Sequence, residues 1–288
     1  LPEAFEQEMK QLLGEEEYEA YRKTFDEAVH RGLRVNNGKI STEEFLRRTD
    51  IPLKKVPWIP NGFYYDEESC NPAKDADYYA GLYYLQEPSA MTPASRLPIE
   101  PDDRVLDLCA APGGKATELG SRIGEGGMLL ANDISNSRAK ALLRNLEIQG
   151  VGRLLVTSED PEKLVTLYPA FFDKILLDAP CSGESSMLRY FSENGPEHYV
   201  PIQKKLIEQA YQMLAEGGEL LYSTCTFSVK ENEEVIAGLL DAHPDMEVQE
   251  ITPGYEGFAP GVSVNGRDLS RCVHIFPQRM EGEGHFVA

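Results

Sequence analysis

The chain of 288 residues lacks the features of secreted, membrane and metal-binding proteins. Its five cysteines are odd in number and form no C-x-x-C pair, a pattern that fits neither a disulfide framework nor a zinc site. No apolar run approaches the roughly 18 residues of a membrane span, and the N-terminus does not resemble a signal peptide. The five histidines show no metal-ligand spacing. These absences predict a cytoplasmic chain with reduced thiols, no membrane contact and no metal.

Positive charge is also scarce, with 28 Lys and Arg against 48 Asp and Glu and a formal net charge of −20. Because phosphate affinity is largely cationic, this balance argues at first sight against nucleic-acid binding. The deficit is uneven, since residues 1–60 carry ten basic and twelve acidic side chains. Adjacent basic pairs occur there at Arg22–Lys23, Arg47–Arg48 and Lys54–Lys55. Two interpretations stay open for these pairs, a solvated surface and an RNA-facing edge.

The stretch R-V-L-D-L-C-A-A-P-G-G-K-A-T at 104–117 reads as a strand, a glycine turn and a helix that begins near Lys115. This unit places a nucleotide-like ligand at the carboxyl end of a strand. Asp107 lies near the strand end, and the N–H groups that open the helix suit a carboxylate. Asp133 ends the next apolar run, where an acid commonly binds a ribose. A tight turn without a ligand is the alternative.

Length and composition predict one large globular domain and a smaller one. From residue 104 onward, strands and helices alternate, which predicts a parallel sheet covered on both faces. We expect strands at 104–108, 128–132, 153–157, 172–177, 218–223, 246–251 and 272–276. We expect helices at 115–123, 136–149, 161–167, 198–214 and 229–242. The last two strands would form an antiparallel edge.

The N-terminal part predicts helices within 3–31, then a strand with an Asn-Gly turn. Ser41 and Glu44 form a capping box for a helix over 42–49. Another helical stretch is expected within 75–96. Four aromatic residues between these helices could stack on bases or pack inside the protein, and packing is the favoured interpretation: Trp58, Phe63, Tyr64 and Tyr65.

Two later stretches, D-A-P-C-S-G at 178–183 and S-T-C-T-F at 223–227, follow predicted strands. With D-L-C-A-A-P-G-G-K they resemble the Sun (Fmu) family of RNA cytosine-5 methyltransferases, in particular its bacterial ribosomal-RNA members, over about residues 87–288. The resemblance implies S-adenosylmethionine as methyl donor and a cytosine of RNA, expected in small-subunit ribosomal RNA, as acceptor. The expected fold is α/β, a Rossmann-like class I methyltransferase with a mostly parallel seven-stranded sheet and a small α+β N-terminal domain. We place an RNA-recognition region at 1–85 and the methyltransferase domain at 86–288, and expect a monomer.

Methylation of cytosine carbon 5 needs a nucleophile that first adds to carbon 6, a task that suits a thiolate. Cys181 and Cys225 both lie just past predicted strands. By resemblance, Cys225 is the nucleophile and Cys181 assists product release. Asp178 would face the cytosine at nitrogen 3 and its amine, and Lys115 would point toward the base or its phosphate.

The family pattern also maps a cofactor site onto ten residues of this sequence, namely Cys109, Ala110, Ala111, Pro112, Gly113, Gly114, Lys115, Asp133, Asp160 and Asp178. Asp160 would lie near the adenine, but the adjacent Ser158 and Glu159 are alternatives. The run Q-E-P-S-A-M at 86–91 is expected to wall the site. Cys70, Cys272 and the Cys109 side chain are predicted to be small buried hydrophobes. The histidines, His30, His198, His243, His274 and His285, are predicted at the surface or in packing.

The sequence departs from the family after P-C-S-G, where E-S-S-M-L-R-Y replaces a Glu-Gly sequence and Arg189 is kept. Ser185 and Ser186 put the loop's RNA contacts in doubt. Larger family members continue into a C-terminal RNA-binding region, so this chain could be a fragment or a minimal form. Two alternatives remain: an amino-directed methyltransferase, which would need an N/D-P-P-Y/F motif where D-A-P-C stands, and a non-catalytic RNA- or cofactor-binding module.

Overall fold

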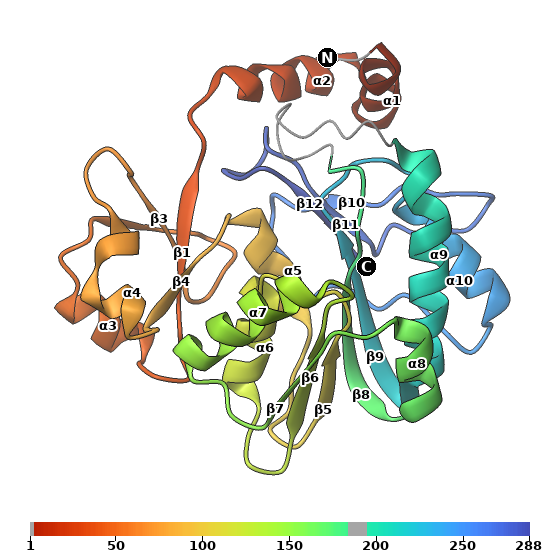
Figure 1. Ribbon diagram of the computed structural model, residues 1–288. Coiled ribbons are helices and arrows are strands. Elements are labelled where there is room, and N and C mark those ends of the chain that lie inside the picture. Colours follow the sequence, from red (N-terminus) through yellow and green to blue (C-terminus); the bar gives the residue numbers. More distant parts are fainter. Residues whose placement is uncertain (1–2, 184–194) are drawn as a thin grey trace. The chain divides into compact units, whose positions relative to one another are not determined.

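The structure is a computed structural model that describes residues 3–183 and 195–288 (Figure 1). The chain divides into two compact units, each made of several segments. The first comprises Leu1–His30, Pro180–Lys205 and Ser223–Ala288, and the second comprises Arg31–Ala179 and Leu206–Tyr222. Since these units are discontinuous in sequence, the division into 1–85 and 86–288 stays a prediction. In the described residues, no helix has both the length and the apolar character that a membrane crossing requires.

A four-stranded antiparallel sheet, with the order β2-β3-β1-β4, begins the second unit. Its strands are β1 (Arg31–Val35), β2 (Leu53–Lys55), β3 (Gly62–Tyr65) and β4 (Tyr83–Leu85), and its helices are α3 (Thr42–Arg48), η2 (Pro72–Lys74) and α4 (Ala76–Tyr79). The predicted capping box is confirmed, because Ser41 Oγ accepts a hydrogen bond of 3.2 Å from the Glu44 N–H. Trp58, Phe63 and Tyr64 are buried, which confirms the packing interpretation. The stretch 75–96 contains a strand as well as short helices.

Parallel strands form the rest of the second unit: β5 pairs with β6 and β8, and β6 pairs with β7. These strands are β5 (Arg104–Asp107), β6 (Met128–Asn132), β7 (Leu154–Thr157) and β8 (Phe172–Asp178). Strand β9 (Leu214–Thr224) lies next to β8 in the sheet order, and its last two residues belong to the first unit. The helices are η3 (Ser89–Met91), α5 (Thr92–Arg96), α6 (Gly114–Arg122), α7 (Asn136–Gln149) and α8 (Pro161–Leu167). In Figure 1, α6 and α7 lie on one face of these strands and α8 on the other. The apolar residues of β5 and β6 are therefore enclosed, and Val105, Leu106 and Leu129 are fully buried.

The first unit contains the N-terminal helices and the antiparallel edge of the large sheet. Its elements are α1 (Glu3–Leu13), α2 (Glu15–Lys23), η1 (Thr24–Asp26), the first part of α9 (Pro196–Met213), α10 (Glu233–Ala242), β10 (Ala259–Pro260), β11 (Val273–Ile275) and β12 (His285–Val287). Strands β10, β11 and β12 pair antiparallel, and β12 pairs with the last two residues of β9. Phe5, Met9, Tyr18 and Tyr21 pack with Phe227 in one buried cluster.

The predicted α/β Rossmann-like fold class is confirmed. The large sheet of the described residues has eight strands rather than seven, in the order β10-β11-β12-β9-β8-β5-β6-β7. The strand predicted at 246–251 is wrong: Met246, Val248 and Ile251 are only half-buried, and the segment pairs with no strand. The edge is instead completed by β12, three buried residues near the end of the sequence. The helical prediction also extended too far, because α2 ends at Lys23.

Candidate active site

A cavity of about 220 Å³ lies beside the glycine turn in the second unit. Its lining comprises Tyr84, Leu85, Gln86, Ala90, Asp107, Cys109, Ala110, Ala111, Pro112, Gly114, Lys115 and Asp178. Gln86 and Ala90 belong to the run that was expected to wall the site. The structure thus brings together most of the predicted 109–115 loop, the predicted wall and Asp178.

The turn has a backbone that only glycine adopts easily. Gly113 precedes α6 with a φ of 114°, and a Cβ added there would lie 3.2 Å from Leu142 Cδ1. Arg34 of β1 holds the next residue, donating a hydrogen bond of 2.6 Å to the Gly114 carbonyl oxygen. Arg34 Nε also lies 2.9 Å from Glu118 Oε2, and both side chains are largely buried. The first turn of α6 is therefore fixed by a residue of the small sheet.

Asp107 is the most unusual acid of the cavity. Its side chain is fully buried, and neither carboxylate oxygen accepts a hydrogen bond of normal geometry from any described residue. Burial, followed by the negative charge of Asp178, raises the pKa of Asp107 to about 8. Lys115 and the backbone N–H of Cys109 offset only part of this rise. The sequence placed Asp107 at the strand end, but it did not single this residue out as a ligand-binding group.

Lys115 and Asp178 form an ion pair at the cavity wall. Lys115 Nζ lies 2.7 Å from Asp178 Oδ2, and the two side chains are 12% and 29% exposed. Lys115 comes from the start of α6 and Asp178 from the last position of β8. The two predicted catalytic groups of this unit are therefore in contact with each other.

Asp133 and Asp160 do not belong to the cavity lining. Asp133 is buried and accepts a hydrogen bond of 2.9 Å from the Ser135 N–H. Arg138 Nη2 lies 3.2 Å from the second oxygen of Asp133. Asp160 is exposed and caps α8 by accepting a 2.9 Å hydrogen bond from the Glu162 N–H. Their cofactor-binding roles stay predictions.

The first unit brings the two predicted catalytic cysteines together. Cys181 Sγ lies 3.3 Å from Cys225 Sγ, and neither cysteine is in a disulfide bond. The hydrogen bond shared with Cys225, together with burial, raises the pKa of Cys181 well above its ordinary value. Cys181 is therefore a thiol at neutral pH, and its S–H can donate to the sulfur of Cys225.

The remaining cysteines differ from one another. Cys272 is buried, as predicted, and burial raises its pKa to about 12. Cys70 and Cys109 are half-buried, so their prediction as buried side chains is wrong. Cys109 faces a cavity instead of a core, which explains its exposure.

The histidines lie at the surface or in packing, as predicted: His274 and His285 are buried, and the other three are not. His274 Nε2 lies 2.7 Å from Glu233 Oε1. No group of three or more His, Cys, Asp or Glu in the described part of the chain could hold a metal ion.

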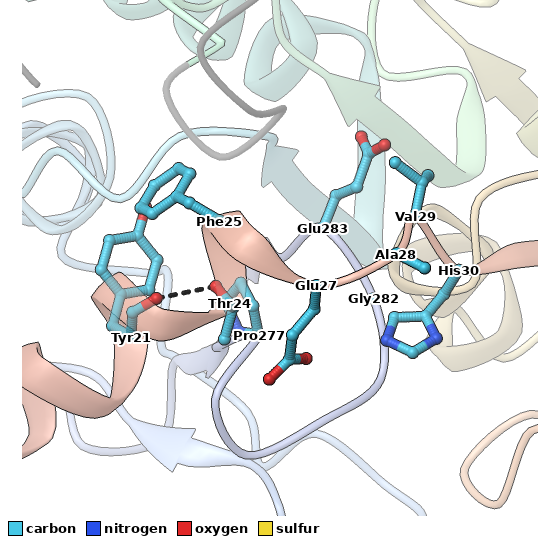
Figure 2. Close-up of a pocket in the computed structure, with 10 residues that line it drawn as sticks. All are labelled: Tyr21, Thr24, Phe25, Glu27, Ala28, Val29, His30, Pro277, Gly282 and Glu283. Carbon is cyan, nitrogen blue, oxygen red and sulfur yellow. Dashed lines mark hydrogen bonds between the residues drawn. The ribbon is translucent and has the colours of Figure 1, made fainter.

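A second pocket lies in the first unit between the 21–30 segment and the loop at 277–283 (Figure 2). Its volume of about 30 Å³ has room for only about two water molecules. Figure 2 shows the rings of Tyr21 and Phe25 on one side and the carboxylates of Glu27 and Glu283 nearer His30. This pocket is too small for a nucleotide-like ligand, so the cavity beside the glycine turn is the candidate cofactor site.

Solved structures define the class of this fold. The chain aligns over its full length with a methyltransferase homologue from Pyrococcus horikoshii, at a TM-score of 0.88 and 30% identity, covering 94% of that chain. It aligns equally completely with NSun6 from P. horikoshii with SFG, covering 97% of that chain at a TM-score of 0.85 and 23% identity, which shows the fold alone. Fold and cavity therefore define a class I methyltransferase.

Residues 94–288 match the family model of the 16S rRNA methyltransferase RsmB/F, and residues 1–88 match that of the N-terminal domain of 16S rRNA methyltransferase RsmF. The chain belongs to the RsmB/F family of methyltransferases, which confirms the resemblance. Relatives named ribosomal RNA small subunit methyltransferase F, from Erwinia tasmaniensis and Escherichia coli O157:H7, are 36% and 33% identical over the whole chain. The chain spans 62% of the length of each.

The predicted departure from the family at Ser185 and Ser186, with Arg189, lies outside the described residues.

Proposed function

We propose that this protein methylates carbon 5 of a cytosine in small-subunit ribosomal RNA, with S-adenosylmethionine as methyl donor. The observation that carries the proposal is the pair of cysteines, Cys181 and Cys225, whose sulfur atoms lie 3.3 Å apart without a disulfide bond. Methylation of an amine needs no thiol, whereas methylation of carbon 5 needs one that adds to the ring and then leaves. The names of the curated relatives support ribosomal RNA of the small subunit as the substrate.

The environment of the pair supports Cys225 as the nucleophile. The raised pKa of Cys181 keeps this residue protonated, so that its S–H can stabilise a thiolate on Cys225. Cys225 adds to carbon 6 and makes carbon 5 nucleophilic. Once carbon 5 carries the methyl group, loss of its proton to a base re-forms the carbon 5–carbon 6 double bond and expels Cys225 as a thiolate. The S–H of Cys181 assists this release by stabilising the departing thiolate.

The cavity of the second unit fits the donor. Asp107 supplies a buried carboxyl group whose oxygens accept no hydrogen bond of normal geometry from any described residue, and a cationic ligand group beside it would favour its ionised form. The N–H groups that open α6 suit a carboxylate. We assign the 109–115 loop, Asp133, Asp160 and Asp178 to binding, and add Asp107. Bound there, S-adenosylmethionine supplies an electrophilic methyl group.

Chain connectivity supports a joint role for Asp178 and the thiols. Cys181 follows Asp178 by three residues, and three residues of extended chain reach at most about 10 Å. Cys225 directly follows β9, the sheet neighbour of β8. We propose that Asp178 hydrogen-bonds the edge of a flipped-out cytosine and that Lys115, 2.7 Å away, holds the Asp178 side chain in place until the base arrives.

We also propose that residues 1–85 recognise RNA. The three basic pairs are exposed, and Lys54 and Lys55 of β2 lie over the rings of Tyr64 and Phe63, at 5.4 and 4.7 Å from the ring centroids. Such cations can contact phosphates although the whole chain is acidic.

The test is methyl transfer by the full chain to small-subunit ribosomal RNA, followed by bisulfite sequencing. A protected cytosine that appears only with active protein and S-adenosylmethionine supports the proposal. RNA from a deletion strain should lose the same mark. Methyl groups found only on exocyclic amines, or no transfer to RNA at all, would overturn the proposal. Cys225→Ala serves as the inactive control.

A further inference from the structure

Three consecutive polar residues, Glu231, Asn232 and Glu233, are fully buried at the start of α10. Buried charges and amides are costly unless hydrogen bonds satisfy them. Each side chain of this triplet contacts a different part of the first unit. Because the three residues are equally buried, differences between their variants can be attributed to their different contacts.

Glu231 holds the chain around Cys181. One oxygen accepts a hydrogen bond of 3.0 Å from the Ser182 N–H, and the carboxylate also accepts from the Ser182 hydroxyl. The side-chain amide of Gln203 donates to Glu231 at 2.7 Å and to the Pro180 carbonyl at 2.9 Å. The residues on both sides of Cys181 are thus fixed by Glu231, directly or through Gln203.

Asn232 holds the chain around Cys225 in the same way. Its side-chain oxygen accepts a 2.6 Å hydrogen bond from the Thr224 hydroxyl, and its amide donates to the Thr226 carbonyl at 2.9 Å. Asn232 occupies the N-cap position of α10, where an asparagine side chain usually bonds the helix N–H groups. Here it makes no such bond and serves the Cys225 segment instead.

The two segments are also joined directly, because the Ser182 hydroxyl lies 3.1 Å from Thr226 Oγ1. Glu233 differs, since it contacts His274 at 2.7 Å and accepts from the Val262 N–H at 3.0 Å, and neither residue adjoins a catalytic cysteine.

We propose that Glu231 and Asn232 are positioning residues that together hold Cys181 and Cys225 in sulfur-to-sulfur contact. The catalytic meaning of this contact rests on the function proposed above, but the contact itself does not. Two nearby groups raise the pKa of Cys181 by their negative charge, first Cys225 and then Glu231.

The experiment is alkylation of Cys181 by iodoacetamide in the full chain as a function of pH, with the modified residue located by mass spectrometry. Asn232→Ala removes only neutral contacts on the Cys225 segment. It should lower the pH midpoint of Cys181 alkylation, because Cys181 loses its bond to Cys225. Glu231→Gln should lower this midpoint at least as far, because a negative charge is lost as well. Glu233→Gln, the matched control of equal burial, should leave the midpoint unchanged.

A double-mutant cycle separates positioning from general loosening. In a Cys225→Ala background the Cys181 thiol has no partner sulfur, so adding Asn232→Ala should no longer move the midpoint. If Asn232→Ala shifts the midpoint equally in both backgrounds, or not at all, the proposal is wrong. Should Asn232→Ala fail to fold, Asn232→Ser, which is also neutral and too short to keep both contacts, takes its place, and the same two outcomes decide.

Methyl transfer provides the second readout. The Glu231 and Asn232 variants should lower kcat about tenfold or more while KM for S-adenosylmethionine stays unchanged, because the cavity residues are untouched. If the unmodified chain methylates no cytosine, the proposed function fails, yet the alkylation series still decides the positioning. If it methylates and Asn232→Ala keeps both kcat and the midpoint, only the positioning fails.

Discussion

The cavity in the second unit and the cysteine pair in the first satisfy their buried polar groups in opposite ways. In the cavity, Asp107 is buried with no hydrogen-bond partner among the described residues. Around the cysteines, Glu231 and Asn232 are equally buried, but hydrogen bonds from the protein hold them in place. An unsatisfied acceptor costs stability and retains affinity for a ligand, whereas a satisfied network fixes geometry before any ligand arrives. The cavity therefore has a buried polar group that a ligand could satisfy, whereas the cysteine pair is already held in a fixed geometry.

The largest expected effect is on the reacting side of this comparison. Cys225→Ser replaces the thiol by an alcohol that is scarcely ionised at neutral pH, so methyl transfer should fall by on the order of 10³-fold or more. Cys181→Ala should still attack and methylate but fail to release its product. It should accumulate a covalent protein–RNA complex that survives denaturing electrophoresis.

One denaturing gel compares Cys225→Ala and Cys181→Ala on a substrate RNA. If Cys225→Ala traps RNA and Cys181→Ala does not, the two roles are exchanged. Unchanged methylation in both variants would rule out a covalent mechanism.

The second effect concerns the pH dependence of stability on the binding side. The folded chain holds the Asp107 proton up to a pH of about 8, whereas the unfolded chain releases it near pH 4. Unfolding between these values therefore releases a proton, and stability falls as pH rises through this window. Asp107→Asn should remove this loss, which we expect to be on the order of 3 kcal/mol.

Urea unfolding at pH 5 and pH 8.5, for the natural chain and Asp107→Asn, measures the difference. Other titrating groups cancel between the two proteins. If stability depends on pH equally in both proteins, the pKa of Asp107 is not raised by burial without hydrogen bonds. The contrast between the cavity and the cysteine pair would then disappear.

The third effect is on cofactor affinity. Asp133→Ala should weaken binding of S-adenosylmethionine by about 1.5–3 kcal/mol, through loss of charge-assisted hydrogen bonds. Calorimetry measures the affinity, and Arg138→Ala controls for the ion pair that Asp133 makes in the free protein. Unchanged affinity in Asp133→Ala would remove this residue from the site.

The smallest effect tests Asp160. Asp160→Ala should lower stability by about 1 kcal/mol because α8 loses its cap, and Asp160→Ser, which keeps a capping oxygen, should not. Thermal unfolding compares the two. Calorimetry on the same proteins tests the predicted adenine contact, which requires both variants to bind S-adenosylmethionine more weakly.

The sequence predicted most accurately those features that depend on residues close together in the chain. Helices α7 and α8 occupy the predicted ranges, and the turn before α6 follows from Pro112, Gly113 and Gly114. The cap at Asp160 was missed, although an aspartate followed by Pro161 is a common helix start.

The sequence could not show contacts between distant segments. Glu231 bonds Ser182 across 49 positions, so the buried triplet 231–233 read as an ordinary polar helix start. The same reason explains the misplaced edge strand: the alternation at 246–251 is typical of a strand, but pairing partners selected β12 instead. The isolation of Asp107 likewise depends on what surrounds it, which no local pattern encodes.

Arg34 makes the small antiparallel sheet indispensable to the glycine turn. It comes from β1, within the predicted N-terminal region, yet its bonds run to Gly114, Thr117 and Glu118 at the start of α6. Cutting the chain at residue 85 would remove Arg34, so that Glu118 would keep only the more distant Arg122, 3.9 Å away, among the cations that the described residues place beside it. The later segment alone should therefore be less stable than the full chain. Strand β1 thus holds the start of α6 through Arg34, so shortened versions of this protein should retain β1.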